Sequence, residues 1–95
     1  MPNDSRKLGD LESIGKAMLR DFEMLGIKSV AQLAKQDAGV LYRKLEKLTG
    51  CRQDPCVLDT FQAAVEQAKD PNLPKEKRQW WYWSWLRKKM DAKKV

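Results

Sequence analysis

The side chains best suited to covalent chemistry in this sequence are two cysteine thiols, Cys51 and Cys56. Asp54 and Pro55 lie between them and are typical of a helix start, with an aspartate cap followed by proline at the first helical position. A helix N-terminus lowers the pKa of a nearby thiol and makes it more reactive. The pair is therefore a candidate redox-sensing or alkylation-sensitive dithiol. The alternative is that Cys56 packs in the interior as a small hydrophobic residue beside a half-exposed Cys51.

Other catalytic chemistry is poorly supported, because the chain contains no histidine. This removes the commonest general base near neutral pH, together with every Ser-His-Asp or Cys-His arrangement. A structural zinc site needs four nitrogen or sulfur ligands, and one chain offers only two thiols. We therefore expect no catalytic residues, no metal and no cofactor, and we predict that the protein is not an enzyme.

Anion binding is the second kind of chemistry that the sequence suggests, at the turn that precedes a helix near Lys16. A helix start presents backbone N–H groups without acceptors and a partial positive charge, and both suit an anion. Gly15 has no side chain, so a phosphate oxygen could approach the backbone there. Lys16 opposes the helix dipole slightly, a cost that a bound phosphate would offset.

The elements that would position these residues are helices, because helical spacing of apolar residues recurs along the chain and no segment alternates long enough to form a strand. We predict a short first helix capped by Asp4 or Ser5, and helices at about 16–25, 29–34, 37–50, 54–70 and 75–90. Capping residues at Ser29, Asp37 and Asp54 and the glycines at 26 and 50 mark their ends. The residues expected on apolar faces are Met18, Phe22, Leu25, Val30, Leu33, Ala34, Leu41, Leu45, Leu48, Val57, Phe61, Ala64 and Ala68.

The segment 11–30 resembles a helix-hairpin-helix motif of the SAM-like kind. Ile14 and Gly15 would close the tight turn, Ala17 is small, and Leu-Gly-Ile precedes a serine-capped helix. The resemblance implies that the turn binds a nucleic-acid phosphate without reading sequence, although the family also uses the motif purely for packing. The family commonly has Pro-Gly where this chain has Glu12 and Ser13. The candidate nucleic-acid-binding residues in this segment are Ser13, Ile14, Gly15, Lys16, Ala17, Arg20 and Lys28.

Residues 40–68 also have the pattern of a helix, a short turn and a second helix. They are either a degenerate second copy of the motif, with Arg52 at its tip as a further nucleic-acid contact, or an ordinary packing pair. We therefore expect an all-α, compact five- or six-helix domain that contains one helix-hairpin-helix unit or a degenerate tandem pair.

A wider resemblance covers roughly residues 8–85. The strings Ile-Gly-x-Ala, Leu-Gly-Ile-x-Ser, Thr-Gly-Cys-Arg-Gln-Asp-Pro-Cys-Val-Leu and Trp-Trp-x-Trp are similar to those of a bacterial family labelled pathogenicity locus or mitomycin resistance protein. The resemblance implies a bacterial source and a helix-hairpin-helix fold. It brings no established biochemical activity.

Four tryptophans lie within six residues, at Trp80, Trp81, Trp83 and Trp85. On a helix Trp80 and Trp83 share one side, and Trp81 and Trp85 share another. We expect one pair to pack on the core and the other to stay exposed as a partner interface. Unpaired bases, a membrane surface, a partner protein or a second copy of the chain remain alternative occupants.

The net charge of +6 comes entirely from residues 75–95, because the first 74 residues carry equal numbers of acidic and basic side chains. We divide the single domain into a body, 1–74, and a tryptophan-rich helix with a basic tail, 75–95. Arg87 and Lys88 are candidate nucleic-acid contacts, whose binding would fall steeply with salt. No stretch approaches the roughly 18 consecutive apolar residues of a membrane span, and the N-terminus lacks a secretory signal. We therefore expect a soluble, cytoplasmic protein.

The sequence thus predicts an accessory module that binds the DNA phosphate backbone weakly and without sequence preference. The alternative is a protein–protein interaction module that uses the tryptophan-rich C-terminal helix and binds no nucleic acid. We expect DNA as the partner, keep a protein partner or self-association as alternatives, and do not expect a membrane partner.

Overall fold

A computed structural model describes residues 6–93, with side chains as far as Met90. Within that range the chain forms five α-helices and two short 3-10 helices (η), and no strand, so the predicted all-α class is confirmed. The elements are η1 (Leu8–Asp10), α1 (Lys16–Met24), α2 (Val30–Leu33), α3 (Ala38–Thr49), α4 (Pro55–Lys69), η2 (Lys75–Arg78) and α5 (Trp80–Lys93). The caps predicted at Asp4 and Ser5 lie outside the described residues.

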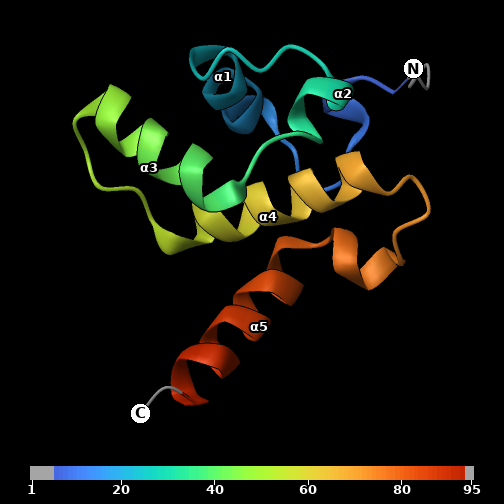
Figure 1. Cartoon of the computed structure of the whole chain (residues 1–95), viewed down its shortest axis with the longest axis vertical. Coiled ribbons are helices and arrows are strands. Elements are labelled where there is room, and N and C mark those ends of the chain that lie inside the picture. The colour runs from blue at the N-terminus through green and yellow to red at the C-terminus, as the bar shows by residue number, and fades with distance from the viewer. Residues whose placement is uncertain (1–5, 94–95) are drawn as a thin grey trace.

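Helix α4 lies in the middle of the molecule. Helices α1, α2 and α3 lie on one side of it and α5 lies on the other (Figure 1). Helix α4 contacts α2, α3, η2 and α5. This central helix is therefore buried on two faces, and it connects the N-terminal part of the chain to the tryptophan-rich helix.

The core between α4 and the N-terminal helices is built around two phenylalanines. The rings of Phe22 and Phe61 have centroids 5.7 Å apart, and both residues are fully buried. Leu48 is 57% exposed, so its predicted place in the core is wrong. Helices α3 and α4 splay apart toward the loop that joins them (Figure 1), which leaves the last turn of α3 uncovered. The other predicted core residues are buried or pack against the core as partly buried neighbours.

The predicted caps of three helices are confirmed. The side chains of Ser29, Asp37 and Asp54 accept hydrogen bonds from the first-turn amides of α2, α3 and α4. Gly50 ends α3 with φ 68°, a left-handed conformation that costs glycine little. These boundaries follow from local chemistry.

The last helix starts later than predicted. Residues Lys75–Arg78 form the 3-10 turn η2, Gln79 is extended, and α5 begins at Trp80. The reason is that the Arg78 carbonyl accepts hydrogen bonds from the Ser13 hydroxyl and the Gln67 amide, both at 3.3 Å. These contacts turn the chain out of a continuous helix at Gln79.

Candidate nucleic-acid interface

The turn before α1 has the backbone conformation of a glycine-containing turn although it carries serine. Ser13 has φ 69°, in the left-handed region that glycine adopts most easily. This is the position where helix-hairpin-helix proteins commonly have glycine. Gly15 then forms the N-cap of α1 with an extended backbone, φ −99° and ψ −175°. Ser13 therefore adopts the left-handed conformation itself, at the position where helix-hairpin-helix proteins commonly have glycine.

A buried glutamine of α4 holds this turn in place. Gln67 is 4% exposed. Its side-chain oxygen accepts from the Glu12 amide at 2.8 Å, and its side-chain nitrogen donates to the Glu12 carbonyl at 2.9 Å. The Ser13 hydroxyl also accepts from the Trp80 amide at 3.3 Å. The turn is thus fixed between α4 and the start of α5.

The N-terminus of α1 is open. No side chain caps it. The first hydrogen bond within the helix runs from the Leu19 amide to the Gly15 carbonyl. Within residues 6–93, the preceding amides of Lys16, Ala17 and Met18 therefore have no hydrogen-bond acceptor. A Cβ atom added to Gly15 would meet no atom within 4 Å. No side chain therefore blocks access to the three free backbone amides or to the positive end of the helix dipole.

The charges around the open N-terminus favour an anion. Lys16 and Arg20 are both exposed and lie one turn apart on the same side of α1. Asp21, one turn further along α1, lines the same surface hollow as Ala17 and Arg20. On the other side of the turn, the Glu12 carboxylate is 3.4 Å from the Arg78 guanidinium and also accepts from the Gln79 side chain. The negative charge of Glu12, directly before the turn, is therefore largely offset.

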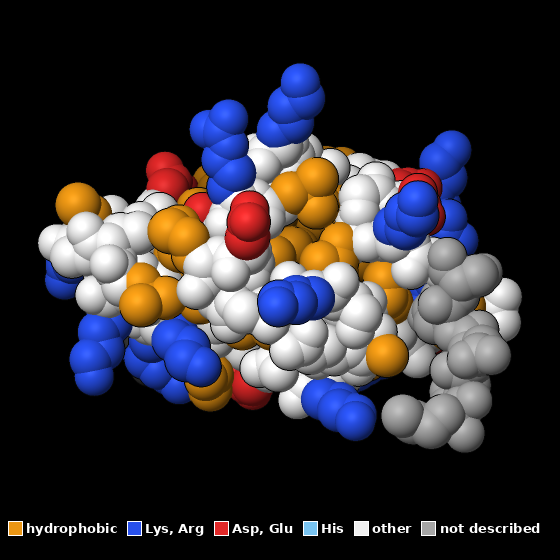
Figure 2. All heavy atoms as spheres, turned by 90° about the horizontal axis from the view of Figure 1, so that it is seen from above, with side chains coloured by type: hydrophobic (Ala, Val, Ile, Leu, Met, Phe, Trp, Pro, Cys, Tyr) orange, Lys and Arg blue, Asp and Glu red, His pale blue; other side chains and the backbone are white. Residues whose placement is uncertain are grey.

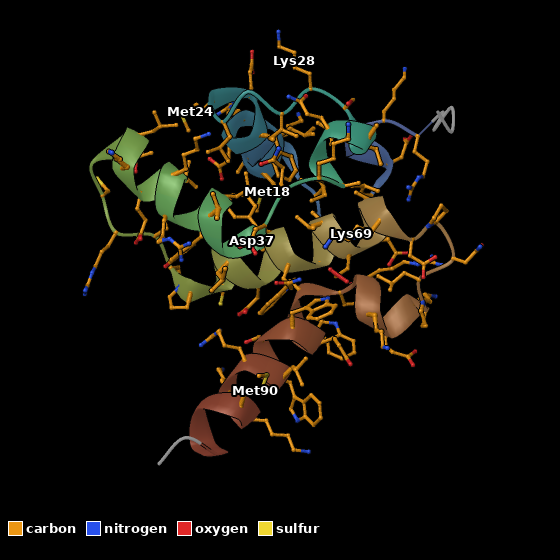
Figure 3. The ribbon with its side chains drawn as sticks, in the orientation of Figure 1. Met18, Met24, Lys28, Asp37, Lys69 and Met90 are labelled. Carbon is orange, nitrogen blue, oxygen red and sulfur yellow. The ribbon has the colours of Figure 1, made fainter. Side chains whose placement is uncertain are left out.

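The structure brings together most of the predicted nucleic-acid residues of this segment. Ser13 to Ala17 form the turn and the first residues of α1, with Ile14 half-buried against the core. Lys28 lies elsewhere, because it follows the far end of α1, and nine helical residues rise about 13 Å. Figure 3 shows Lys28 pointing outward on the side of the molecule away from α5.

The second predicted turn differs from the first at its helix start. Arg52 is exposed in the loop between α3 and α4. The first turn of α4 is already occupied by the Asp54 carboxylate, which accepts from the Cys56 amide at 2.8 Å. This hydrogen bond lowers the pKa of Asp54 and so keeps the carboxylate charged. A phosphate at this helix start would have to displace a negative charge.

The two predicted contacts on α5 have different environments. Arg87 forms a two-pronged ion pair with Asp59 of α4, at 3.0 and 3.1 Å. Asp59 is 2% exposed, so Arg87 serves to hold α5 against α4. Lys88, the next residue, is exposed to solvent.

The tryptophans divide differently from the expected pairs. Trp81 and Trp85 are 52% and 54% exposed, as one pair was expected to be, but Trp80 is also 41% exposed. Trp80 is the first residue of α5, and its backbone amide donates to the Ser13 hydroxyl of the body. Trp83 is the partly buried one, and its ring nitrogen donates to the Lys77 carbonyl at 2.7 Å.

Both cysteines are exposed and not disulfide-bonded, so the predicted interior place of Cys56 is wrong. The splayed start of α4 leaves this turn uncovered (Figure 1). A hydrogen bond with Asp54, and to a lesser degree burial, raise the pKa of the Cys56 thiol. This is opposite to the effect expected of a helix N-terminus, because the capping carboxylate disfavours a thiolate beside it.

We predict that Cys56 alkylates slowly at neutral pH. In a Cys51→Ser variant, the rate of reaction with iodoacetamide should rise with pH only above the range of an ordinary thiol. Asp54→Asn retains a capping side chain and removes the charge, so it should move the profile to lower pH. A Cys56 that reacts faster at pH 7 than free cysteine would contradict this assignment.

Two negative findings apply to the part of the chain that the structure describes. No group of three or more Cys, Asp or Glu residues is arranged to hold a metal ion there. None of the helices described is long and apolar enough to cross a bilayer.

The structure is thus a small all-helical domain with an open helix N-terminus beside a tryptophan-rich helix. Residues 2–89 match the family described as pathogenicity locus (Cdd1), and the chain belongs to this family. The mitomycin resistance protein McrB of Streptomyces lavendulae is 39% identical over 90 residues, which cover 95% of this chain and 82% of the relative. No solved structure shows significant similarity to the chain. The family match includes both the turn and the four tryptophans.

Proposed function

We propose that this protein is a non-enzymatic, cytoplasmic accessory module that binds the phosphate backbone of nucleic acid without sequence preference. The observation that carries the proposal is the open N-terminus of α1, with three unused amides behind Gly15. Backbone amides at a helix start bind phosphate oxygens well and carry no information about base sequence. This is the use that the resemblance to helix-hairpin-helix proteins implies for the turn.

The distribution of charge predicts that the binding is weak. Figure 2 shows lysine and arginine side chains scattered over the face formed by the N-terminal helices, rather than gathered in one stripe. Lys16 and Arg20 are the cations next to the turn. A module with so few phosphate contacts should bind with a Kd on the order of 10⁻⁴ to 10⁻⁶ M at physiological salt, and more tightly when salt is lowered.

A protein–protein interaction module is the second candidate. The exposed rings of Trp81 and Trp85 favour it, because large exposed aromatic side chains often mark interfaces. Self-association would be seen by light scattering as a rise in mass with concentration, and it should be lost when both rings are removed.

The Gly15→Asp variant tests the phosphate site. Aspartate is a good N-cap residue, so the variant should be as stable as the wild type or more stable. Its carboxylate would occupy the α1 amides and repel phosphate, so we expect at least tenfold weaker binding of a fluorescein-labelled duplex, measured by anisotropy at low salt. Lys16→Glu should weaken binding in the same direction.

The matched control is Ala31→Asp, which adds the same charge to the exposed first turn of α2, a helix that Ser29 already caps. This control should bind within about twofold of the wild type, since its charge lies far from the proposed phosphate. Wild-type affinity in Gly15→Asp would refute the assigned site.

A further inference from the structure

The solvent-facing side of α5 is both aromatic and basic. Trp81, Trp85, Lys88 and Lys89 are spaced as i, i+4, i+7 and i+8, and all four are exposed. We call these four residues the outer α5 face. Residues 80–90 contain no aspartate or glutamate. The face therefore offers flat apolar rings and positive charge to whatever binds it.

One cation of the outer α5 face contacts one of its rings. The Lys89 ammonium lies 4.8 Å from the centroid of the Trp85 ring, within cation–π distance. Tyr82 lies beside Trp85 with ring centroids 6.3 Å apart. Lys89 thus covers one face of the Trp85 ring, while Trp85 as a whole is 54% exposed and offers its other face to a base.

The outer α5 face starts directly beside the proposed phosphate site. The Trp80 amide donates to the Ser13 hydroxyl, so the first residue of α5 contacts the turn that precedes α1. A strand with one phosphate at the α1 N-terminus could therefore continue onto α5. This continuity depends on a hydrogen bond between residues 67 positions apart in the sequence.

We propose that the outer α5 face stacks unpaired bases of a single-stranded nucleic acid whose backbone phosphate is held at the Ser13–Ala17 turn. The inference rests on the proposed function and names its substrate class. Trp81 and Trp85 are separated by about 6 Å along the helix axis, because each residue rises about 1.5 Å. Bases stacked in a duplex are only about 3.4 Å apart, so the two rings match bases that have separated.

Charge complementarity supports the same occupant. Base stacking on aromatic rings tolerates any sequence, and lysines beside the rings neutralise the adjoining phosphates. Residues 80–90 carry no acidic side chain, which suits a polyanion at Trp85, Lys88 and Lys89. Beside Trp81 the cation of Lys75 accompanies the carboxylate of Glu76. An anionic lipid surface or a partner protein is the competing occupant, and the experiment separates each of them.

The experiment compares three labelled probes with the full-length protein at low salt. They are a thymidine oligonucleotide, an abasic oligonucleotide of the same length, and a duplex of that length. We expect the thymidine strand to bind at least tenfold more tightly than the abasic strand, because each stacked base adds about that factor. Binding of the thymidine strand should also quench tryptophan fluorescence.

The variants separate stacking from simple apolar contact. Trp81→Leu together with Trp85→Leu should reduce thymidine-strand affinity to that of the abasic strand and leave abasic binding unchanged. The corresponding phenylalanine variants keep a stacking ring and should retain most of the preference. Leu48→Ala removes an equally exposed apolar side chain from α3 and should have no effect.

The outcomes distinguish this inference from the proposed function. Equal affinity for thymidine and abasic strands, both weakened by Gly15→Asp, would overturn base stacking and leave the phosphate site standing. If the preference for the thymidine strand depended on the two tryptophans but affinity were unchanged in Gly15→Asp, stacking would be supported and the phosphate site would be overturned. Binding only to vesicles of equal parts phosphatidylcholine and phosphatidylglycerol, or tryptophan-dependent self-association without oligonucleotide binding, would overturn the inference.

Discussion

Replacing Arg87 by methionine is expected to lower the free energy of unfolding by about 3 kcal/mol. Methionine keeps much of the apolar stem of the arginine but leaves the Asp59 carboxylate, whose side chain is 3% exposed, without its charged partner. An uncompensated buried charge is among the costliest defects that a single substitution creates. Urea unfolding followed by far-UV circular dichroism would measure the loss.

The reciprocal variant, Asp59→Ala, is expected to cost less, about 2 kcal/mol. The Arg87 side chain is 28% exposed and can be solvated when the carboxylate is removed. Adding Arg87→Met to Asp59→Ala should then cost little more. If both single variants lost the same free energy of unfolding, and the double variant lost the sum of the two, the two residues would not act as a pair.

The Gln67→Met variant is expected to lose about 2–4 kcal/mol of stability and to weaken nucleic-acid binding as well. Methionine has a similar volume but cannot pair with the amide and carbonyl of Glu12, both of which Gln67 satisfies. The turn before α1 would lose its attachment to α4. Urea unfolding gives the stability, and hydrogen exchange at the Glu12 amide reports the loosened turn.

Gln62→Met is the matched control for this variant. Gln62 is on the same helix and is half-buried, but within residues 6–93 its side-chain amide hydrogen-bonds only to the Glu66 side chain, at 3.3 Å. We expect a change of less than about 1 kcal/mol and unchanged nucleic-acid affinity. If both glutamine variants behaved alike, the positioning role of Gln67 would be wrong.

Local chemistry allowed most helix boundaries to be predicted from the sequence. The caps at Ser29, Asp37 and Asp54 and the left-handed Gly50 depend only on residues within one turn. The spacing of Met18 and Phe22 likewise identified the buried face of α1. Each of these signals lies within a few residues of the feature that it predicts, so the sequence alone was enough to place the helix ends and the buried face.

The second buried face of α4 could not be read in the same way. Asp59, Ala63 and Gln67 repeat at i, i+4 and i+8 and are all buried, but two of the three are polar. A pattern that counts apolar residues assigns such a face to solvent. Their partners lie as far as 55 residues away in sequence, at Glu12 and Arg87. Only the tertiary arrangement brings them together.

The late start of α5 has the same origin. The pattern of residues 75–90 is compatible with one helix, but the Arg78 carbonyl is bound by Ser13 and Gln67. This long-range contact places the first tryptophan beside the turn. The juxtaposition of the two candidate interface regions was therefore not predictable from the sequence.

An amide NMR titration of the ¹⁵N-labelled protein with a short duplex at low salt would locate the bound phosphate. If a phosphate binds at the start of α1, the largest shift changes should fall on the amides of Lys16, Ala17 and Met18, and they should diminish as salt is added. If the largest shift changes fell in the loop around Arg52 or in α2, and the α1 amides did not shift, the α1 N-terminus would not be the phosphate site.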